Sequence, residues 1–291
     1  MKNDILKLFN VEKLGVLLSD EYSIKGFPYC KNCNTPRFAD FIDEQGVRHV
    51  VRALCSCQIK KCKEEEELRL KEKRMKNFRE RQKLSMIGER YLNASFKNSI
   101  LTKNNTEVYK RCINYVKNAD RVLSENIGLY IYGDNSSGKT HLTACMCNEL
   151  ISNGFTCVYT SLPKILSEIQ KSFSINNGLG QADIINMLSN KQFVFIDDLG
   201  KEFLGKSTNK SQSSFAEKVL LEILNARDNN KLPTIFSSNY TIKYFAENFN
   251  LDKAIMERIN VMATRVLKLD GDNFREKALI EKDKIAKELG I

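Results

Sequence analysis

No stretch of the sequence approaches the roughly 18 consecutive apolar residues that a membrane-spanning helix needs, so we expect no membrane segment. The first 15 residues, MKNDILKLFNVEKLG, contain two acids and no long apolar run, which argues against a secretory signal. The sequence shows no internal repeat. These absences predict a cytoplasmic protein that does not contact a membrane.

Disulfide bonds are not expected either, because the nine cysteines are odd in number and no export signal is present. The 291 residues, 42% of them hydrophobic and 28% charged, suit one large domain and a small one. A net charge of +10 and an isoelectric point of about 9.0 favour contact with nucleic acid or another polyanion. A lysine-rich solvated surface would give the same net charge without such a partner.

The charge and cysteine patterns divide the chain into segments. Residues 63–84 are almost all charged and lack Gly and Pro, which predicts a helix that is either a solvated connection or a coiled-coil or partner-binding segment. We therefore expect a cysteine-rich domain at 1–62, a charged helical linker at 63–84, a large domain at 85–278 and the end of a C-terminal helix at 279–291.

Between Leu84 and Arg275, short β-rich runs such as GLYIYG, TCVYTS, FVFIDD and PTIFSSN alternate with helical patterns. This alternation predicts an α/β fold with a mostly parallel sheet and helices on both faces. Gly154 is expected to end the helix that follows the first of these strands.

A glycine-rich loop follows the GLYIYG run. It has the complete pattern G-x4-G-K-T, with a strand before it and a helix after it. Its backbone N–H groups and the helix N-terminus can bind phosphates, Lys139 can reach the β and γ phosphates, and the Thr140 hydroxyl can bind Mg²⁺. The expected ATP-binding residues are Gly133, Asp134, Asn135, Ser136, Ser137, Gly138, Lys139, Thr140 and His141.

Three residues of the helix after this loop have simpler interpretations. For His141, a packing or hydrogen-bonding role is favoured over a catalytic one. Cys145 and Cys147 are two residues apart, so they do not face each other on a helix and are expected to be core residues rather than a metal pair.

Two acids end the buried run FVFIDD. Asp197 lies where ligands bind in open α/β sheets and can hold Mg²⁺, and Asp198 can act as the base for an attacking water. Asn239, at the end of the next strand, can position that water, although Asn is also a common turn residue.

Further along, Asp252 is expected to cap a helix whose apolar face includes Ile255 and Ile259, with Arg258 on its flank. Such an arginine is either a solvated side chain or an arginine finger for a neighbouring subunit. The role of Arg275, in the motif DNFR, is equally undecided.

Five cysteines lie within 33 residues near the N-terminus. C-x2-C is half of a zinc knuckle, and a second pair about 20 residues later can complete a four-thiolate site that is structural, since it leaves no open coordination position. The expected zinc ligands are Cys30, Cys33, Cys55 and Cys57, with Cys62 in reserve and His49 as another replacement.

Together, the motifs GDNSSGKTHL, FVFIDDLG, PTIFSSN, MERI and DNFR resemble the ATPase module of bacterial replicative helicase loaders of the DnaC/DnaI type. That group belongs to the AAA+ superfamily, has a P-loop three-layer sandwich and is close to the IstB transposition ATPases. The resemblance covers about residues 85–278 and includes an entry segment near the adenine at 88–98. The cysteine-rich segment favours DnaI-type loaders over IstB proteins.

The resemblance implies a catalytic role for each matching residue. Lys139 is the Walker A lysine, Asp197 and Asp198 are the Walker B pair, Asn239 is sensor 1, Arg258 is an arginine finger acting in trans, and Arg275 is sensor 2. Asp198 stands where many AAA+ proteins have Glu, which leaves the rate of hydrolysis open. An ATPase that is weak unless assembled is therefore expected.

Three functions follow as hypotheses: an ATP-dependent loader of a hexameric helicase that also binds single-stranded DNA, an IstB-like transposition ATPase, and a zinc-containing adaptor switched by ATP without significant hydrolysis. For DNA contact the sequence offers Lys164, Lys171 and Phe173, whose segment is otherwise an ordinary amphipathic helix over the sheet.

Overall fold

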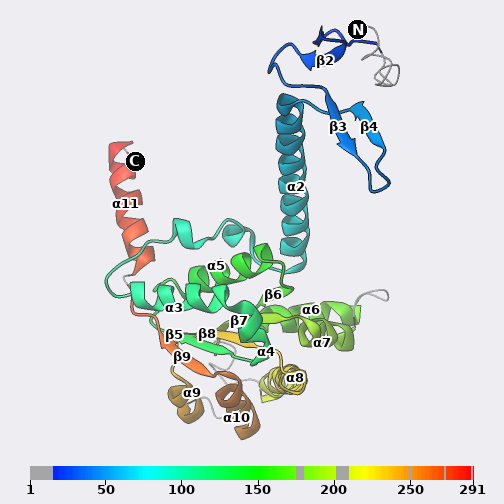
Figure 1. Cartoon of the computed structure of the whole chain (residues 1–291). Helices are drawn as coiled ribbons and strands as arrows, with labels where there is room; N and C mark the ends of the chain where they lie inside the picture. Colours follow the sequence, from blue (N-terminus) through cyan, green and yellow to red (C-terminus); the bar gives the residue numbers. More distant parts are fainter. Residues whose placement is uncertain (1–15, 175–179, 201–209, 249–250, 272, 290) are drawn as a thin grey trace. The chain divides into compact units, whose positions relative to one another are not determined.

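The computed structural model describes residues 16–174, 180–200, 210–248, 251–271, 273–289 and 291 (Figure 1). The chain divides into two compact units, Met1–Lys76 and Asn77–Ile291. Within the described residues, no helix combines the length and apolar character that crossing a membrane requires.

The N-terminal unit contains two antiparallel hairpins. The first joins β1 (Glu21–Ile24) to β2 (Phe27–Cys30), and the second joins β3 (Phe38–Ile42) to β4 (Arg48–Arg52). The two residues that link β1 to β2 both have positive φ, 51° and 88°, as a tight two-residue hairpin turn requires, and the second is a glycine.

A long charged helix, α2 (Ser56–Leu84), begins directly after the second hairpin. The charged helix expected at 63–84 is therefore the later part of a helix that starts within the cysteine-rich segment. Its exposed face carries ion pairs one turn apart, such as Lys60–Glu64, which support an isolated helix weakly. Its only buried residue is Gln82, which donates to Leu92 O at 2.7 Å and to Asn148 Oδ1 at 3.0 Å.

The larger unit is built on a five-stranded parallel sheet in the order β6-β7-β8-β5-β9. Its strands are β5 (Leu129–Tyr132), β6 (Cys157–Thr160), β7 (Phe193–Leu199), β8 (Thr234–Ser238) and β9 (Arg265–Lys268). Its short helical turns are η2 (Glu89–Tyr91) and η3 (Phe96–Asn98). Its helices are α3 (Thr106–Lys117), α4 (Ala119–Ser124), α5 (Lys139–Ser152), α6 (Leu162–Ser174), α7 (Gln181–Asn190), α8 (Lys210–Asn229), α9 (Ile242–Asn248), α10 (Lys253–Met262) and α11 (Phe274–Glu288).

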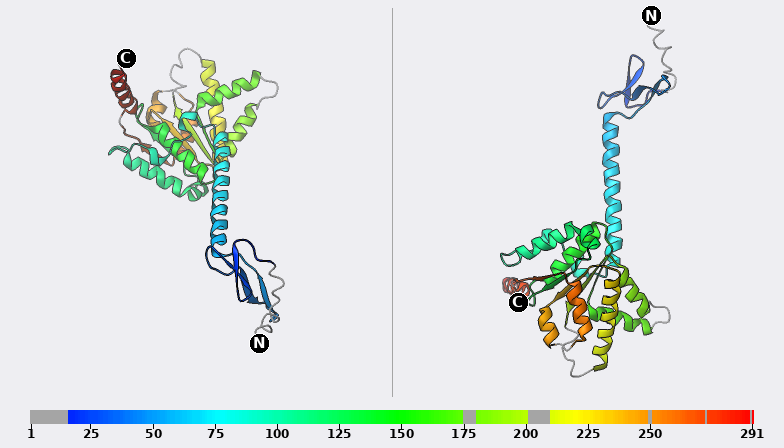
Figure 2. Two further views of the ribbon diagram at one scale, coloured as in Figure 1. Left: turned by 90° about the horizontal axis from the view of Figure 1, so that it is seen from above. Right: turned by 60° about the horizontal axis from the view of Figure 1, so that its bottom comes forward.

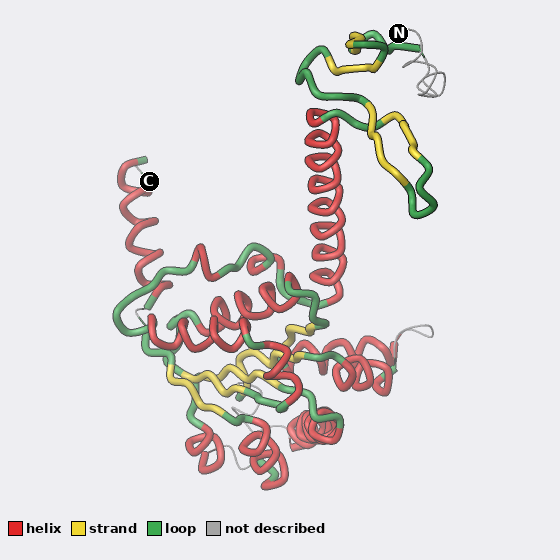
Figure 3. Tube along the Cα trace, viewed as in Figure 1, coloured by secondary structure: helices red, strands yellow, loops and turns green. Residues whose placement is uncertain are grey.

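Successive residues of the central strands point to opposite faces of the sheet, and each face has its own core. Phe193 and Phe195 pack with α3 and α5, whereas Val194 and Ile196 pack with α6, α7, α8 and α10. Figures 1 and 2 show α3 and α5 over one face and α8 and α10 over the other, and Figure 3 shows the strands between the two helix layers. The predicted α/β fold is confirmed.

Local details also follow the sequence. Gly154 has a φ of 99° just beyond α5, and the Asp252 side chain accepts a hydrogen bond from the Ala254 N–H at the start of α10. Cys145 and Cys147 are fully buried in the core. The expected segment limits at 62 and 278 fall inside α2 and α11, respectively.

Candidate functional site: a phosphate loop at the sheet edge and a four-cysteine cluster

The glycine-rich loop connects β5 to α5, as predicted. At Gly133 an added Cβ would lie 2.2 Å from the Leu269 carbonyl oxygen, so no side chain fits there. Gly138 has a φ of 94° at the start of α5, a conformation that costs glycine least. These two glycines allow the chain to turn sharply and direct the first N–H groups of α5 toward the loop.

The side chain of Lys139 folds back over this loop. The residue is 6% exposed, and its Nζ donates to the carbonyl oxygens of Gly133 and Asp134, each at 2.8 Å. The ammonium group is thus held beside the turn whose backbone can bind phosphate, which is where an interaction with a triphosphate requires it.

Asp197, on β7, lies beside the loop helix and the neighbouring strand. Its carboxylate accepts a hydrogen bond from the Ser237 hydroxyl, and the nearby hydroxyls of Tyr159 and Thr140 also lower its pKa. Burial raises the pKa of Asp197, and these hydroxyls oppose that rise. The structure therefore brings Thr140 and Asp197, the two predicted magnesium ligands, near each other.

Asp198 continues the strand in an unusual conformation. Its φ is 58°, and the pairing of β7 with β8 shifts register between Ile196 and Leu199. The backbone N–H of Asp198 donates to Ser237 Oγ at 3.0 Å, and Asn239 Nδ2 donates to its carboxylate at 3.4 Å. The irregularity turns the second acid toward the amide predicted to act with it.

A cavity of about 430 Å³ opens over the loop. Of the predicted residues, its lining includes Asn135, Ser136, Gly138, Lys139, Thr140, His141, Asp198, Asn239 and Arg275. The remaining lining residues are Arg90, Tyr91, Asn98, Ile100, Tyr109, Phe274 and Glu281. Three of these belong to the 88–98 segment that the resemblance places near the adenine. The sequence carries no local signal for Tyr109 or Glu281.

The start of α11 is fastened to the loop. Phe274 donates its N–H to the Ser136 carbonyl oxygen at 3.2 Å, and a Cβ at Gly271 would lie 2.7 Å from the Ser137 carbonyl oxygen. This contact places Arg275 at the wall of the cavity.

His141 makes a hydrogen bond, one of the two roles favoured for it over a catalytic one. Its Nε2 lies 3.2 Å from Ser99 Oγ, and burial lowers the pKa of His141. The ring therefore favours the neutral state near the phosphate loop.

Arg258, on α10, is not one of the described residues that line this cavity. Its Nε donates to Asn225 Oδ1 at 2.8 Å, and its Nη1 forms an ion pair with Asp228. Both partners belong to α8. A role at the cavity of its own chain therefore has no support in the geometry.

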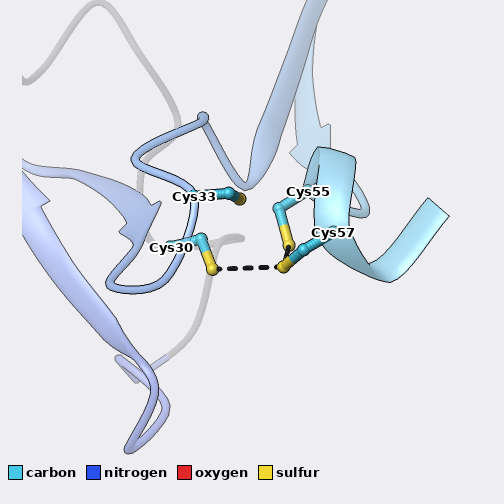
Figure 4. Close-up of side chains that lie close together, drawn as sticks. All are labelled: Cys30, Cys33, Cys55 and Cys57. Carbon is cyan, nitrogen blue, oxygen red and sulfur yellow. Dashed lines mark hydrogen bonds between the residues drawn. The ribbon is translucent and has the colours of Figure 1, made fainter. Parts of the chain in front are cut away.

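The four cysteines predicted as zinc ligands come together in the N-terminal unit (Figure 4). Their Sγ atoms all lie within 4.8 Å of one another. Cys57 Sγ lies 3.7 Å from Cys30 Sγ and 3.1 Å from Cys55 Sγ, distances too long for a disulfide bond. A tetrahedral zinc with Zn–S bonds of about 2.3 Å separates its sulfurs by about 3.8 Å, so the set fits this metal.

The cluster also favours thiolates at its N-terminal pair. Hydrogen bonds with the Thr35 and Ser56 hydroxyls lower the pKa of Cys33 to about 4, and the backbone N–H groups of Cys33 and Asn32 lower the pKa of Cys30. Hydrogen bonds with the Cys55 and Cys33 sulfurs raise the pKa of Cys57 to about 12, and a bound cation would favour its thiolate form.

Neither alternative zinc ligand belongs to this cluster. His49 Nε2 lies 2.7 Å from Asp43 Oδ2, and Cys62 is exposed on α2. The candidate DNA-contact residues also have partners within the chain: Lys164 Nζ donates to Met86 O, and Lys171 pairs with Glu168. The side chain of Phe173 lies outside the described residues.

Residues 58–282 match the family described as IstB-like ATP binding protein. The chain belongs to this family. The matched region contains the phosphate loop, the acids of β7, Arg258 and Arg275, and it begins one residue after Cys57. Membership of an ATP-binding family agrees with the nucleotide that the loop predicts.

Among curated proteins, the chain is 26% identical over 194 residues to the replicative helicase loader DnaC of Buchnera aphidicola subsp. Baizongia pistaciae, a match that covers 66% of this chain and 74% of the relative. It is 27% identical over 158 residues to the replicative helicase loader DnaI of Bacillus subtilis, covering 51% of this chain and 47% of the relative. The Escherichia coli DnaC match, at 25% identity, covers 52% of this chain and 58% of that protein. The chain thus spans about half the length of these last two relatives.

Solved structures support the fold. A crystal structure of the DnaC helicase loader aligns with a TM-score of 0.52 and 19% identity, covering 63% of this chain and all of that one (100%). A putative primosome component from Streptococcus pyogenes serotype M3 aligns with a TM-score of 0.50 and 24% identity, covering 65% of this chain and 92% of the other. The AAA+ type of α/β fold expected from the motifs is confirmed.

Proposed function

We propose that this protein is an ATP-dependent loader of a replicative DNA helicase. The observation that carries the proposal is the cavity in which the phosphate loop, Asp198 of β7, Asn239 and Arg275 meet at one edge of the sheet. The helicase as partner comes from the relatives, which are named replicative helicase loaders. The proposed reaction is hydrolysis of ATP to ADP and phosphate. A cytoplasmic location follows from the proposed partner.

Each polar group in the cavity has a defined task in this reaction. Lys139 and the loop N–H groups bind the β and γ phosphates. Thr140 and Asp197 would hold Mg²⁺, which would supply positive charge against the phosphates. Asp198, oriented by Asn239, accepts the proton of the attacking water. Arg275 binds phosphate oxygens from the α11 side.

We further propose that Arg258 completes the site of a second copy of the chain. Its absence from the described lining of its own cavity supports a role in trans. Hydrolysis by an isolated chain is then weak, and it increases when copies assemble.

The N-terminal unit is proposed to bind one structural zinc and to hold the hexameric helicase. Four thiolate ligands leave no coordination position open, so the metal would stabilise a unit whose described residues, 16–76, form only four short strands and bury few side chains. Single-stranded DNA is the proposed second partner, supported by the net charge of +10. Lys164, Lys171 and Phe173 remain candidates for that contact.

ATP turnover by the wild type, Lys139→Ala and Arg258→Ala, with and without single-stranded DNA, tests the proposal. We expect Lys139→Ala to lose ATP binding, and Arg258→Ala to bind ATP normally but turn it over poorly. Lys243→Ala, which removes an exposed lysine paired with Glu247, is the matched control. Normal ATP binding by Lys139→Ala would contradict the assignment of the loop.

The family match keeps an IstB-like transposition ATPase as a second candidate. Capture from native extract in the presence of ATP separates the two, because a loader retains a hexameric helicase and an IstB-like protein retains a transposase. An absence of turnover under every condition would favour an ATP-switched adaptor instead, since Asp198 has the shorter of the two acidic side chains.

A further inference from the structure

The Arg258 guanidinium is held from one side by two residues of α8. Asn225 and Asp228 are one helical turn apart, so they lie on the same face of α8, and they engage Nε and Nη1, respectively. A guanidinium group is planar and rigid, so fixing two of its nitrogens fixes the direction in which the third projects.

The end of α8 that carries Asp228 is itself fastened to the sheet. The preceding residue, Arg227, is 0% exposed and donates to Thr234 Oγ1 at the start of β8 and to the Pro233 carbonyl oxygen. It also donates to the Leu188 and Lys191 carbonyl oxygens at the end of α7. A buried cation with this many hydrogen-bond acceptors is costly to displace, so the end of α8 that carries Asp228 is held in a fixed position.

We propose that Asp228 and Asn225 are positioning residues that pre-orient Arg258 for the nucleotide site of a second copy. The inference rests on the proposed function, in which Arg258 acts in trans. A free arginine side chain loses rotamer freedom when it reaches a phosphate, whereas a clamped one has already lost it. Both charges of the pair are partly solvated, with side-chain exposures of 40% and 22%, so orientation is their main contribution.

Mixing two inactive variants of the full chain isolates this role. Arg258→Ala copies keep the nucleotide site but lack the finger, and Lys139→Ala copies keep the finger but lack the site. We expect ATP turnover to rise when they are mixed. Adding Asp228→Ala or Asn225→Ala to the Lys139→Ala donor should lower the restored turnover by about tenfold or more, because misplacing a catalytic group by about 1 Å can cost about a hundredfold.

The dependence on donor concentration separates positioning from assembly. We expect the plateau turnover to fall with the Asp228→Ala donor, while the donor concentration that gives half of the plateau stays the same. A shift in that concentration alone would show that Asp228 only holds α8 and α10 together for docking, and would overturn the inference. The recipient's affinity for ATP should not change.

Two controls complete the test. Glu247→Ala in the donor removes an exposed pair with Lys243 on neighbouring α9 and should leave restoration intact. Asp228→Asn in the donor keeps an acceptor oxygen and should therefore give part of the restored turnover. Equal turnover with the Lys139→Ala donor and with donors that also lack Asp228 or Asn225 would overturn the positioning role. It would not contradict the action of Arg258 in trans. No restoration by any donor would overturn the trans role, and the clamp with it.

Discussion

Replacing Ser237 by Ala tests how the first acid of β7 is held. Ser237 is 1% exposed, and its hydroxyl donates to the Asp197 carboxylate while accepting the Asp198 N–H. A buried hydrogen bond to a charged group contributes about 1.5–3 kcal/mol, so we expect the free energy of unfolding to fall by about 2 kcal/mol. Urea denaturation of the nucleotide-free protein measures this loss.

The neighbouring residue provides a matched control. Ser238 is equally buried, and its hydroxyl donates to the Leu199 carbonyl oxygen and accepts the Tyr240 N–H, so Ser238→Ala removes two hydrogen bonds without touching Asp197. Both variants should lose similar stability. Only Ser237→Ala should need about tenfold more Mg²⁺ for half-maximal turnover, a typical effect of losing a residue that orients a metal ligand.

The pH dependence provides a further check on Ser237→Ala. Burial raises the pKa of Asp197 in the folded chain, and the Ser237 hydrogen bond opposes the rise, so the pKa of Asp197 rises further in Ser237→Ala. The folded state then binds more protons than the unfolded state, and stability falls as pH increases between the unfolded and folded pKa values. The stability deficit of Ser237→Ala relative to Ser238→Ala should therefore widen with rising pH. Equal deficits at every pH, with equal Mg²⁺ requirements, would refute the reasoning.

Three further predictions concern the metal cluster, a buried imidazole and the loop. Cys57→Ser should lose the zinc, whereas Cys62→Ser should keep about one zinc per chain by elemental analysis; retention by both would exclude the proposed ligand set. Burial lowers the pKa of His141, so the unfolded chain takes up its proton first and stability should fall as pH drops below about 6.5. His141→Gln should weaken this dependence of stability on pH, as measured by urea titrations at several pH values. An unchanged pH dependence would show that another group causes it. Gly133→Ala places a Cβ 2.2 Å from a backbone oxygen and should lower the free energy of unfolding by more than about 2 kcal/mol. Gly88→Ala places its Cβ in open space and should have nearly no effect in thermal melts. Equal effects of the two substitutions would contradict the close approach at Gly133.

The sequence predicts the loop, the parallel sheet and the grouping of four cysteines because each depends on local pattern. The loop needs fixed glycine spacing, the strands need short apolar runs, and a zinc knuckle needs two cysteines three positions apart. Their positions in the structure follow directly from those patterns.

Contacts between distant segments could not be predicted in the same way. Ser237 reaches Asp197 because β8 pairs beside β7 in one register, and a shift of one residue would turn its hydroxyl to the other face. Tyr159, on β6, also lowers the pKa of this acid. The partners of Arg258 depend on how α8 packs against α10, which no spacing in the sequence encodes.

The sequence pattern also did not predict where α2 begins, for a different reason. The run of charges marks where the helix is exposed, but the helix already begins at Ser56, within the cysteine pattern. Cys57 is therefore both a member of the sulfur cluster and a first-turn helical residue.

The two hydrogen bonds of the Lys139 ammonium group have a consequence for how nucleotide is selected. Its ammonium group already has two neutral carbonyl partners at 2.8 Å, so an incoming ligand must offer oxygens with more negative charge to displace them. A nucleoside without phosphates supplies no such oxygens, however well its base fits. Because phosphate oxygens must replace these carbonyl oxygens, the loop selects anions before any base or sugar is recognised.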